Sequence, residues 1–255
     1  LAPMVLCLKA WKSRSLPGIF FMNFSIIIPV FNEQSNISNL VDEIFFSLKK
    51  YKNNFEVVIV EDKSIDDTKK ILNIIKKKYK PYIITIYNDK NYGQSLSLIK
   101  GINVSTFNTI ITIDGDGQND PADIPKMLEI FKKSNYSLVG GIRVKRKDNL
   151  LKLISSKIAN FIRSAYLADG CPDTGCSLKI FNKETFLKFD HFDGIHRFIP
   201  ALFLAYNEKN FYLPVNHRPR IYGKSNYGTF IRAIKGLRDM YKVKKMIKKI
   251  KLQND

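Results

Sequence analysis

The sequence predicts an α/β protein with a mostly parallel β-sheet that is covered by helices on both faces. Runs of β-branched and other apolar residues alternate along the chain with longer segments in which apolar residues recur at helical spacing. The strand-like runs are apolar throughout instead of alternating with polar residues. Such runs are typical of strands buried on both sides, because the connecting helices of a parallel sheet cover its two faces.

The predicted elements follow one another from residue 24 onward. Strands are expected at 24–30, 55–60, 82–87, 109–113 and 136–140, where β-branched and aromatic residues are concentrated. Helices are expected at about 36–51, 66–79 and 93–104, and another begins near Pro121, since proline favours the first turn of a helix. Ser35 is a residue type that favours the N-cap position and is expected to cap the first helix.

A basic amphipathic helix is expected at the C-terminus from about residue 226. Its apolar residues recur at steps of three and four: Ile231, Ile234, Leu237, Met240, Val243, Ile247 and Ile250. Lysines fill much of the remaining surface. Two interpretations stay open: the helix lies in an anionic membrane interface, or it packs its apolar stripe on the core with the lysines in water.

The composition describes a folded protein with an excess of positive charge. A length of 255 residues, 45% of them hydrophobic, suits one domain with a sizeable core and argues against global disorder. The formal net charge of +19 favours an anionic partner such as a phosphate, an acidic membrane surface or nucleic acid. Most of the lysines are nevertheless interpreted as solvated helix surfaces. No run of about 18 apolar residues predicts a bilayer-spanning segment.

We divide the chain into an N-terminal extension at 1–21, a main domain at 22–228 and the C-terminal helix at 229–255. Residues 1–21 begin with apolar residues and continue with basic ones, the reverse of the order in a secretory signal. Cys7, Cys171 and Cys176 form no zinc-like or redox pattern, which favours reduced thiols in a cytosolic protein, although a disulfide between Cys171 and Cys176 stays open.

A cluster of carboxylates directly follows the fourth predicted strand. Asp114, Asp116 and Gln118 are spaced by two residues, so in extended backbone their side chains would share one face. Oxygen ligands gathered at one point are what Mg²⁺ or Mn²⁺ needs. Glycines at 115 and 117 would let a bulky ligand approach the backbone. The alternative is a polar turn, since Asp-Gly is a common turn pair.

Polar side chains also follow the first and second predicted strands. They are Asn32 and Glu33 after the first strand, and Glu61, Asp62, Ser64 and Asp66 after the second. Ligands of open α/β sheets bind outside the carboxyl ends of the strands, so we expect the three clusters to form one site. Carboxylates gathered at one rim repel one another unless cations offset their charge, which favours a metal–nucleotide site.

Several segments occur in an order and at spacings that resemble a known family. They read IPVFNE at 28–33, VEDKSIDDT at 60–68, NYG at 91–93 with Gly101 beyond it, DGDGQ at 114–118, DTGC at 173–176 and RIYGKS at 220–225. As a set they resemble glycosyltransferase family 2, particularly its branch of dolichyl- or polyprenyl-phosphate sugar synthases. The resemblance extends over about residues 24–228. Lys63 departs from it, because the family has Gly there, so the turn must tolerate a side chain.

The resemblance implies a GT-A fold, which is Rossmann-like, and transfer of a sugar with inversion from GDP-mannose or a UDP-sugar. It implies that Asp114, Asp116 and Gln118 hold Mg²⁺ or Mn²⁺ against the diphosphate. It implies donor contacts from Pro29, Phe31, Glu33, Val60, Asp62, Asp114 and Gly115, with Arg220 and Lys224 closing over the diphosphate. Asp116 and Arg143 would be the catalytic residues.

On the acceptor side the resemblance points to a polyprenyl or dolichyl phosphate. Arg143 occupies the family's position for a phosphate-contacting arginine, and Lys152 and Ser156 would assist it. A phosphate monoester is largely ionised near pH 7, because its second pKa is about 6, so no strong general base is required. We expect peripheral contact with the cytoplasmic face of a membrane and no nucleic-acid partner, and the oligomeric state stays open.

Two other functions stay open on the sequence alone. A saccharide or lipid-linked oligosaccharide acceptor would need a general base for its hydroxyl, and Asp173 is the nearest candidate. A nucleic-acid-binding protein would need aromatic or arginine readout residues, whereas the positive charge here is mostly lysine. The sequence therefore favours a metal-dependent glycosyltransferase.

Overall fold

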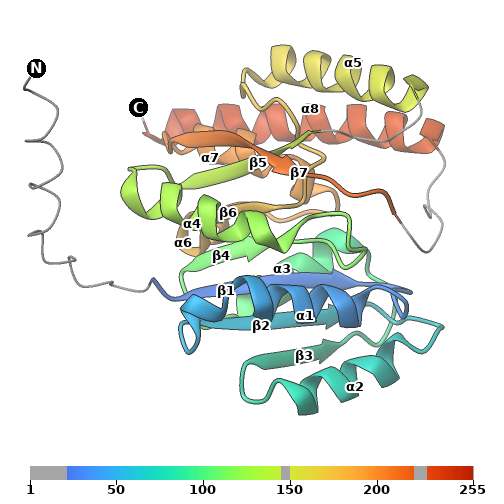
Figure 1. Ribbon diagram of the computed structural model, residues 1–255. Coiled ribbons are helices and arrows are strands. Elements are labelled where there is room, and N and C mark those ends of the chain that lie inside the picture. Colours follow the sequence, from blue (N-terminus) through green and yellow to red (C-terminus); the bar gives the residue numbers. More distant parts are fainter. Residues whose placement is uncertain (1–21, 145–149, 221–228, 255) are drawn as a thin grey trace, which may run out of the picture.

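The computed structural model describes residues 22–144, 150–220 and 229–254; the side chains of 150–157, 229–234 and 254 lie outside the description. Within these ranges one sheet has seven strands in the order β3-β2-β1-β4-β6-β5-β7 (Figure 1). The strands are β1 (Phe24–Val30), β2 (Phe55–Glu61), β3 (Ile83–Tyr87), β4 (Thr109–Thr112), β5 (Leu138–Val144), β6 (Lys179–Asn182) and β7 (Asn210–Asn216).

The sheet is mostly parallel, as predicted. Parallel pairing joins β3, β2, β1 and β4, and it also joins β5 to β7. β6 runs antiparallel between β4 and β5. Lys179, the first residue of β6, lies opposite Thr112, the last residue of β4. The loop before β6 therefore meets the loop after β4 at one edge of the sheet.

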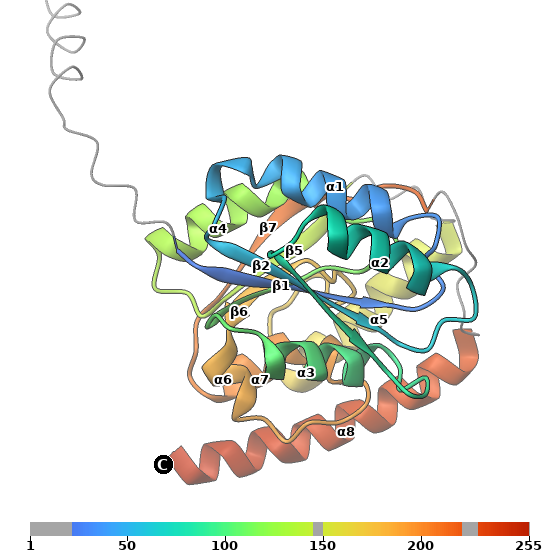
Figure 2. The ribbon, with the colours of Figure 1, turned by 90° about the horizontal axis from the view of Figure 1, so that it is seen from below.

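Helices cover both faces of the sheet (Figure 2). The first face carries α1 (Ile37–Ser47), α2 (Thr68–Lys78) and α4 (Ile124–Lys133), with the short helices η1 (Lys49–Tyr51) and η2 (Pro121–Asp123) beside them. The second carries α3 (Gln94–Val104), α6 (Lys183–Leu187), η3 (Ile195–Arg197), α7 (Ile199–Ala205) and α8 (Thr229–Asn254). α5 (Leu150–Leu167) lies beside α8 (Figure 1).

Successive residues of the central strands enter two separate hydrophobic clusters. Ile26 and Ile28 of β1 pack with α1, α2 and α4, whereas Ile27 packs with α3, α7 and α8. Both faces of the strand are therefore buried, which explains why its sequence is apolar throughout. Gly101 lets α3 approach the sheet closely, since a Cβ atom there would lie 2.6 Å from Cγ2 of Ile27.

The five predicted strands and the helices between them are present, with ends that shift by a few residues. The prediction that Ser35 caps the first helix is wrong. α1 begins at Ile37 with Asn36 at the N-cap position, and no side chain caps it. The carbonyl of Glu33 accepts hydrogen bonds from the backbone N–H groups of Asn36 and Ile37, so Ser35 lies within the turn that leads into the helix.

The C-terminal helix packs part of its apolar stripe on the core. Val243, Ile247 and Ile250 of α8 are buried in the second hydrophobic cluster, whereas Leu237 is 60% exposed. Over this part of the helix the structure agrees with the core-packing interpretation. No helix in the described part of the chain is both long and apolar enough to cross a membrane. Cys171 and Cys176 are buried free thiols, so the disulfide that the spacing left open is not formed.

Replacing Lys63 with glycine is expected to raise the free energy of unfolding by about 0.5–1 kcal/mol, because Lys63 has a φ of +62° and left-handed backbone disfavours residues with a Cβ atom. Urea unfolding measures the change. Lys77→Gly, in an exposed position of α2, is the control and should lower the free energy by about 1 kcal/mol. Destabilisation by Lys63→Gly would contradict the strain argument.

Candidate active site

A cavity of about 610 Å³ opens at the edge of the sheet where the parallel strands end. Pro29 near the end of β1, Asp114 after β4 and Arg143 near the end of β5 line it. The turn at 174–177 and the loop around η3 complete its walls. The strand-end location is the one that the sequence predicted for a ligand site.

Side chains after β2 tie the neighbouring loops together. Oγ of Ser64 accepts a hydrogen bond from the backbone of Asn32 at 3.0 Å, and Oγ1 of Thr68 accepts one from that of Glu33 at 2.9 Å. Oδ2 of Asp66 accepts one from the backbone of Gln34 at 3.2 Å. These motif residues therefore fix the loop that follows β1, and their side chains do not join the carboxylates after β4.

Asp62 is also used to build the site. Its Oδ1 accepts hydrogen bonds from Nδ2 of Asn88 at 2.7 Å and from the backbone of Tyr92 at 2.8 Å. Its Oδ2 accepts one from the backbone of Gly93 at 2.7 Å. The residue is only 3% exposed. These oxygens hold the 91–93 loop in the cavity wall, and a donor contact by Asp62 stays a prediction.

The acids after β1 and β4 do meet. Nη2 of Arg220 donates to Oε1 of Glu33 at 3.2 Å and to Oδ2 of Asp116 at 3.0 Å. Burial raises the pKa of the Glu33 carboxyl, while the hydrogen bond from Asn36 and the charge of Arg220 oppose that rise. The guanidinium of Arg220 therefore bridges two carboxylates that follow different strands, Glu33 after β1 and Asp116 after β4. This places Arg220 at the edge of the sheet where the sugar donor is predicted to bind.

Asp114 is a partly buried carboxylate beside a second one. Burial, and next the negative charge of Asp116, raise the pKa of Asp114 to about 6. Its Oδ1 accepts a hydrogen bond from Nε2 of Gln94 at 2.6 Å, and its backbone N–H donates to Oγ of Ser177 at 3.2 Å. Two carboxylates that disfavour each other's charge are stabilised by a cation placed between them.

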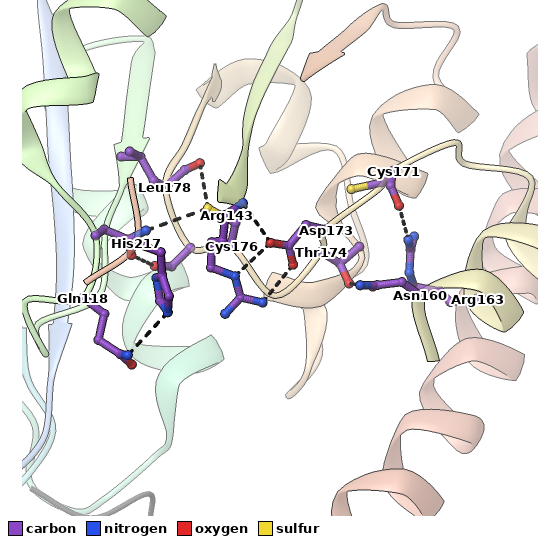
Figure 3. A network of polar contacts seen from close by, with 12 residues as sticks. Gln118, Arg143, Asn160, Arg163, Cys171, Asp173, Thr174, Cys176, Leu178 and His217 are labelled. Atoms are coloured by element: carbon purple, nitrogen blue, oxygen red, sulfur yellow. Dashed lines mark hydrogen bonds and ion pairs between the residues drawn. The ribbon is translucent and has the colours of Figure 1, made fainter. Parts of the chain in front are cut away.

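Gln118 does not share a face with the two aspartates in extended backbone. The chain turns at residues 115–117, and Gly117 has a φ of +72°. Nε2 of Gln118 donates to the carbonyl of Arg218 at 3.2 Å and lies 3.4 Å from Nε2 of His217 (Figure 3). The extended-strand geometry behind the metal prediction is therefore wrong. The turn explains this, because it breaks the two-residue alternation of a strand.

The carboxylates of Asp114 and Asp116 still fit a divalent cation that binds together with a ligand. Among the residues that the structure describes, no group of three His, Cys, Asp or Glu side chains is arranged to hold a metal ion alone. Mg²⁺ is commonly bound by one or two carboxylates while substrate phosphates supply further oxygens. Asp114 and Asp116 meet that requirement.

The remaining predicted donor residues differ in their placement. Val60 is fully buried and its side chain packs in the second hydrophobic cluster, and its contact with the donor stays a prediction. Gly115 lies against the end of β1, since a Cβ atom there would lie 3.4 Å from the carbonyl oxygen of Pro29. Phe31 is partly exposed. Lys224 lies outside the described residues.

Asp173 fixes Arg143, which also lines the cavity. Nε of Arg143 donates to Oδ2 of Asp173 at 2.8 Å, and Nη2 donates to Oδ1 at 2.8 Å (Figure 3). The side chains are 15% and 7% exposed. Gly175 provides the room, because a Cβ atom there would lie 2.5 Å from Nη2 of Arg143. The planar guanidinium is therefore held in one orientation at the cavity.

Comparison with known proteins identifies the family. The model of glycosyl transferase family 2 matches residues 25–189. The chain belongs to this family. Its match covers the strand ends that carry Glu33, Asp114 and Arg143, and it ends just beyond α6.

Curated relatives of this family member are longer than the chain. The undecaprenyl-phosphate 4-deoxy-4-formamido-L-arabinose transferase of Yersinia pestis (strain Pestoides F) is 30% identical over 203 residues, which cover 80% of this chain and 62% of the relative. The protein of the same name from Pectobacterium carotovorum subsp. carotovorum is 28% identical over 218 residues, covering 86% of this chain and 66% of the relative. The chain thus spans a little under two thirds of these relatives.

Solved structures support the GT-A fold. Glucosyl-3-phosphoglycerate synthase from Mycobacterium tuberculosis, crystallised with Mn²⁺, UDP and phosphoglyceric acid, matches with a TM-score of 0.64 and 14% identity. The match covers 86% of this chain and 78% of that chain. A structure of the same enzyme with Mg²⁺ and UDP gives a TM-score of 0.63 at 14% identity and covers 86% of this chain and 79% of that one.

Lys179 is a cavity residue that sequence reasoning missed. It is 4% exposed, and its Nζ donates to the carbonyls of Cys176 and of Thr174, the latter at 3.4 Å. Its positive charge opposes the rise in the pKa of Asp114. A single lysine within the apolar run 178–181 was the available signal, because a charge inside a buried strand requires a partner.

Proposed function

We propose that the chain binds a nucleotide-diphosphate sugar together with a divalent cation and transfers the sugar to a polyprenyl phosphate. The observation that carries the proposal is the composition of one cavity. Asp114, with the negative charge of Asp116 beside it, lines the cavity at one strand end, and the oriented guanidinium of Arg143 lines it at another. One side suits a cation with a diphosphate, and the other suits a second phosphate.

On the donor side, Asp114 and Asp116 would hold Mg²⁺ or Mn²⁺. The bound ion would supply positive charge at the diphosphate, where negative charge grows as the glycosidic bond breaks. Arg220 already lies at Asp116 and Glu33, so its guanidinium is placed to face the same anion. Pro29 and the 91–93 loop line the cavity together with Asp114, and Asp62 holds that loop in place.

On the acceptor side, the pairing of Asp173 favours a phosphate over a hydroxyl acceptor. Both carboxylate oxygens of Asp173 accept hydrogen bonds from Arg143, so this carboxylate serves to orient a cation instead of removing a proton. An ionised phosphate needs no general base. The names of the curated relatives, which are undecaprenyl-phosphate transferases, support the same acceptor class. Such an acceptor lies in a bilayer, so we also propose peripheral membrane contact.

The proposal is tested by product analysis. The protein is incubated with GDP-mannose and a panel of UDP-sugars, with undecaprenyl or dolichyl phosphate in detergent and Mg²⁺ or Mn²⁺, and products are read by mass spectrometry. A glycosyl phospholipid whose formation stops in EDTA is expected. Transfer only to saccharide acceptors, or transfer that EDTA leaves unchanged, would overturn the proposal.

Arg143→Lys is expected to lower the rate of transfer about 10- to 100-fold. Lysine keeps the charge but cannot make the two parallel hydrogen bonds to Asp173, and a charge-assisted hydrogen bond contributes about 1.5–3 kcal/mol. Steady-state kinetics should assign the loss to kcat and to the KM for the lipid phosphate, with the KM for the donor little changed. Arg238→Lys, at an exposed position of α8, is the control. Equal kinetics for both variants would remove Arg143 from the acceptor site.

A further inference from the structure

The outer surface of α5 has an unusual composition. Every exposed side chain between residues 158 and 167 is apolar: Ile158, Ala159, Phe161, Ile162, Ala165 and Tyr166. Phe161 is 76% exposed, Ile158 is 54% exposed and Ile162 is 49% exposed. Single exposed apolar residues are ordinary on soluble proteins, but a continuous apolar stripe over more than two helical turns marks a binding surface.

The inner surface of the same helix carries polar side chains beside the buried Leu167. Arg163 is 5% exposed and pairs with Asp169, and it also donates to the carbonyl of Cys171. Oγ1 of Thr174 donates to Oδ1 of Asn160 at 3.2 Å (Figure 3). These contacts fix the rotation of α5 about its axis, so the apolar residues cannot turn inward. Over residues 158–166 the helix therefore buries a polar residue and exposes apolar ones, the opposite of the usual surface helix.

Lys244 of α8 borders this apolar surface, and Tyr241 and Lys245 lie on the same side of α8 as Lys244, because residues three and four apart are neighbours on a helix. Nζ of Lys244 donates to the carbonyl of Tyr166 at 2.8 Å and lies 5.5 Å from the centre of its ring. Nζ of Lys245 lies 4.6 Å from the ring centre of Tyr241, which is 58% exposed. Aromatic rings beside lysines at the border of an apolar face are typical of helices that lie in a lipid headgroup region. The charges favour an anionic surface and disfavour a second copy of this basic chain.

We propose that the α5 face, defined as Ile158, Phe161, Ile162 and Tyr166 with Lys244 and Lys245 beside it, contacts an anionic lipid bilayer. The membrane surface is therefore assigned to α5, because the apolar stripe of α8 is largely occupied by the core. The inference deepens the proposed function and rests on it in one respect, which is that the acceptor lies in the bilayer.

The α5 face also lies next to the acceptor wall of the cavity. Thr174 lines the cavity and is bonded to Asn160 of α5, and the turn that carries Thr174 also carries Asp173, the partner of Arg143. Docking of α5 on a bilayer therefore brings the Arg143 side of the cavity towards the lipid headgroups. A lipid phosphate would reach Arg143 without leaving the membrane surface.

Vesicle flotation tests the proposal on the full chain. Vesicles of phosphatidylcholine with phosphatidylglycerol are compared with vesicles of phosphatidylcholine alone. The test variant is the double substitution Phe161→Gln and Ile162→Gln. The control is Phe46→Gln with Ile74→Gln, because these residues are 74% and 65% exposed on α1 and α2. We expect the wild type and the control to bind the anionic vesicles, and the α5 variant to bind at least about tenfold more weakly.

Several outcomes would overturn the inference. They are failure of the wild type to bind anionic vesicles, equal binding by the α5 variant, and sedimentation that shows a wild-type dimer dispersed by the α5 variant. Thermal unfolding of all three proteins establishes that they are folded.

Transfer with the acceptor dispersed in detergent separates this inference from the proposed function: the α5 variant should keep its rate in detergent and lose it on vesicles. If the α5 variant loses vesicle binding but the wild type transfers no sugar in detergent, the membrane contact of the α5 face is supported and the proposed function is rejected.

Discussion

Replacing Asp114 with asparagine is expected to lower the rate of sugar transfer about 100- to 1000-fold, the loss that follows removal of one preorganised electrostatic partner. The substitution keeps the size of the side chain and an oxygen that can accept from Gln94, whose Nε2 lies 2.6 Å from Oδ1. It removes one of the two negative charges that would hold the cation. Initial rates at saturating Mg²⁺ or Mn²⁺ measure the effect.

The control for this variant is Asp190→Asn. Asp190 is an exposed carboxylate whose contact with Lys249 is long, at 3.9 Å, so its loss should leave the rate within about twofold of the wild type. The Asp114→Asn protein should also unfold at a temperature no lower than the wild type, because a carboxylate whose pKa burial has raised opposes folding in its charged form. Transfer at the wild-type rate by Asp114→Asn would show that this residue does not hold the cation.

Arg163→Met is expected to lower the free energy of unfolding by about 3–5 kcal/mol, because it leaves the charge of Asp169 buried without its partner. The two side chains are 6% and 0% exposed, and Arg163 also donates to the carbonyl of Cys171. Urea unfolding followed by circular dichroism measures the change. Transfer activity should fall as well, since the 169–176 segment carries Asp173.

An exposed ion pair provides the comparison for the buried one. Lys133→Met breaks the pair between Lys133 and Glu129 on α4, whose side chains are 71% and 60% exposed. Its loss should change the free energy of unfolding far less than the loss of the buried pair. If Arg163→Met and Lys133→Met lower the free energy of unfolding by the same small amount, the Arg163–Asp169 pair does not hold α5 against the 169–176 segment.

The parallel half of the fold was predictable because its strands are apolar on both faces and its helices show clear periodicity. The other half was not. β6 has four residues and begins with Lys179, so its apolar run is too short and too interrupted by charge to predict a strand. β7 contains Pro214, which makes a strand harder to predict because proline has no N–H to donate within a sheet. Proline is tolerated in edge strands, and β7 is one. α5 was missed because it departs from the usual pattern of a surface helix: the charged Arg163 is buried and the apolar Phe161 is exposed.

The candidate site was predictable in its location but only partly in its members. The acids after β1 and β4 meet as expected, because carboxyl ends of parallel strands share one edge. The acids and hydroxyls after β2 follow the same rule of position, yet Asp62 and Ser64 are used by backbone N–H groups of nearby loops. Sequence spacing cannot show this, since it depends on which loop donors need partners. The turn at Gly117 likewise separated Gln118 from the two aspartates.

The central claim is that Asp114 and Asp116 hold a divalent cation together with a nucleoside diphosphate. Calorimetric titration of UDP and GDP, in EDTA and then in Mg²⁺ or Mn²⁺, tests it most directly on the wild type and on the Asp114→Asn, Asp116→Asn double variant. We predict that the cation strengthens binding of one nucleotide to the wild type at least about tenfold and has no such effect on the variant. Equal affinity of the wild type in EDTA and in the cation would contradict the account.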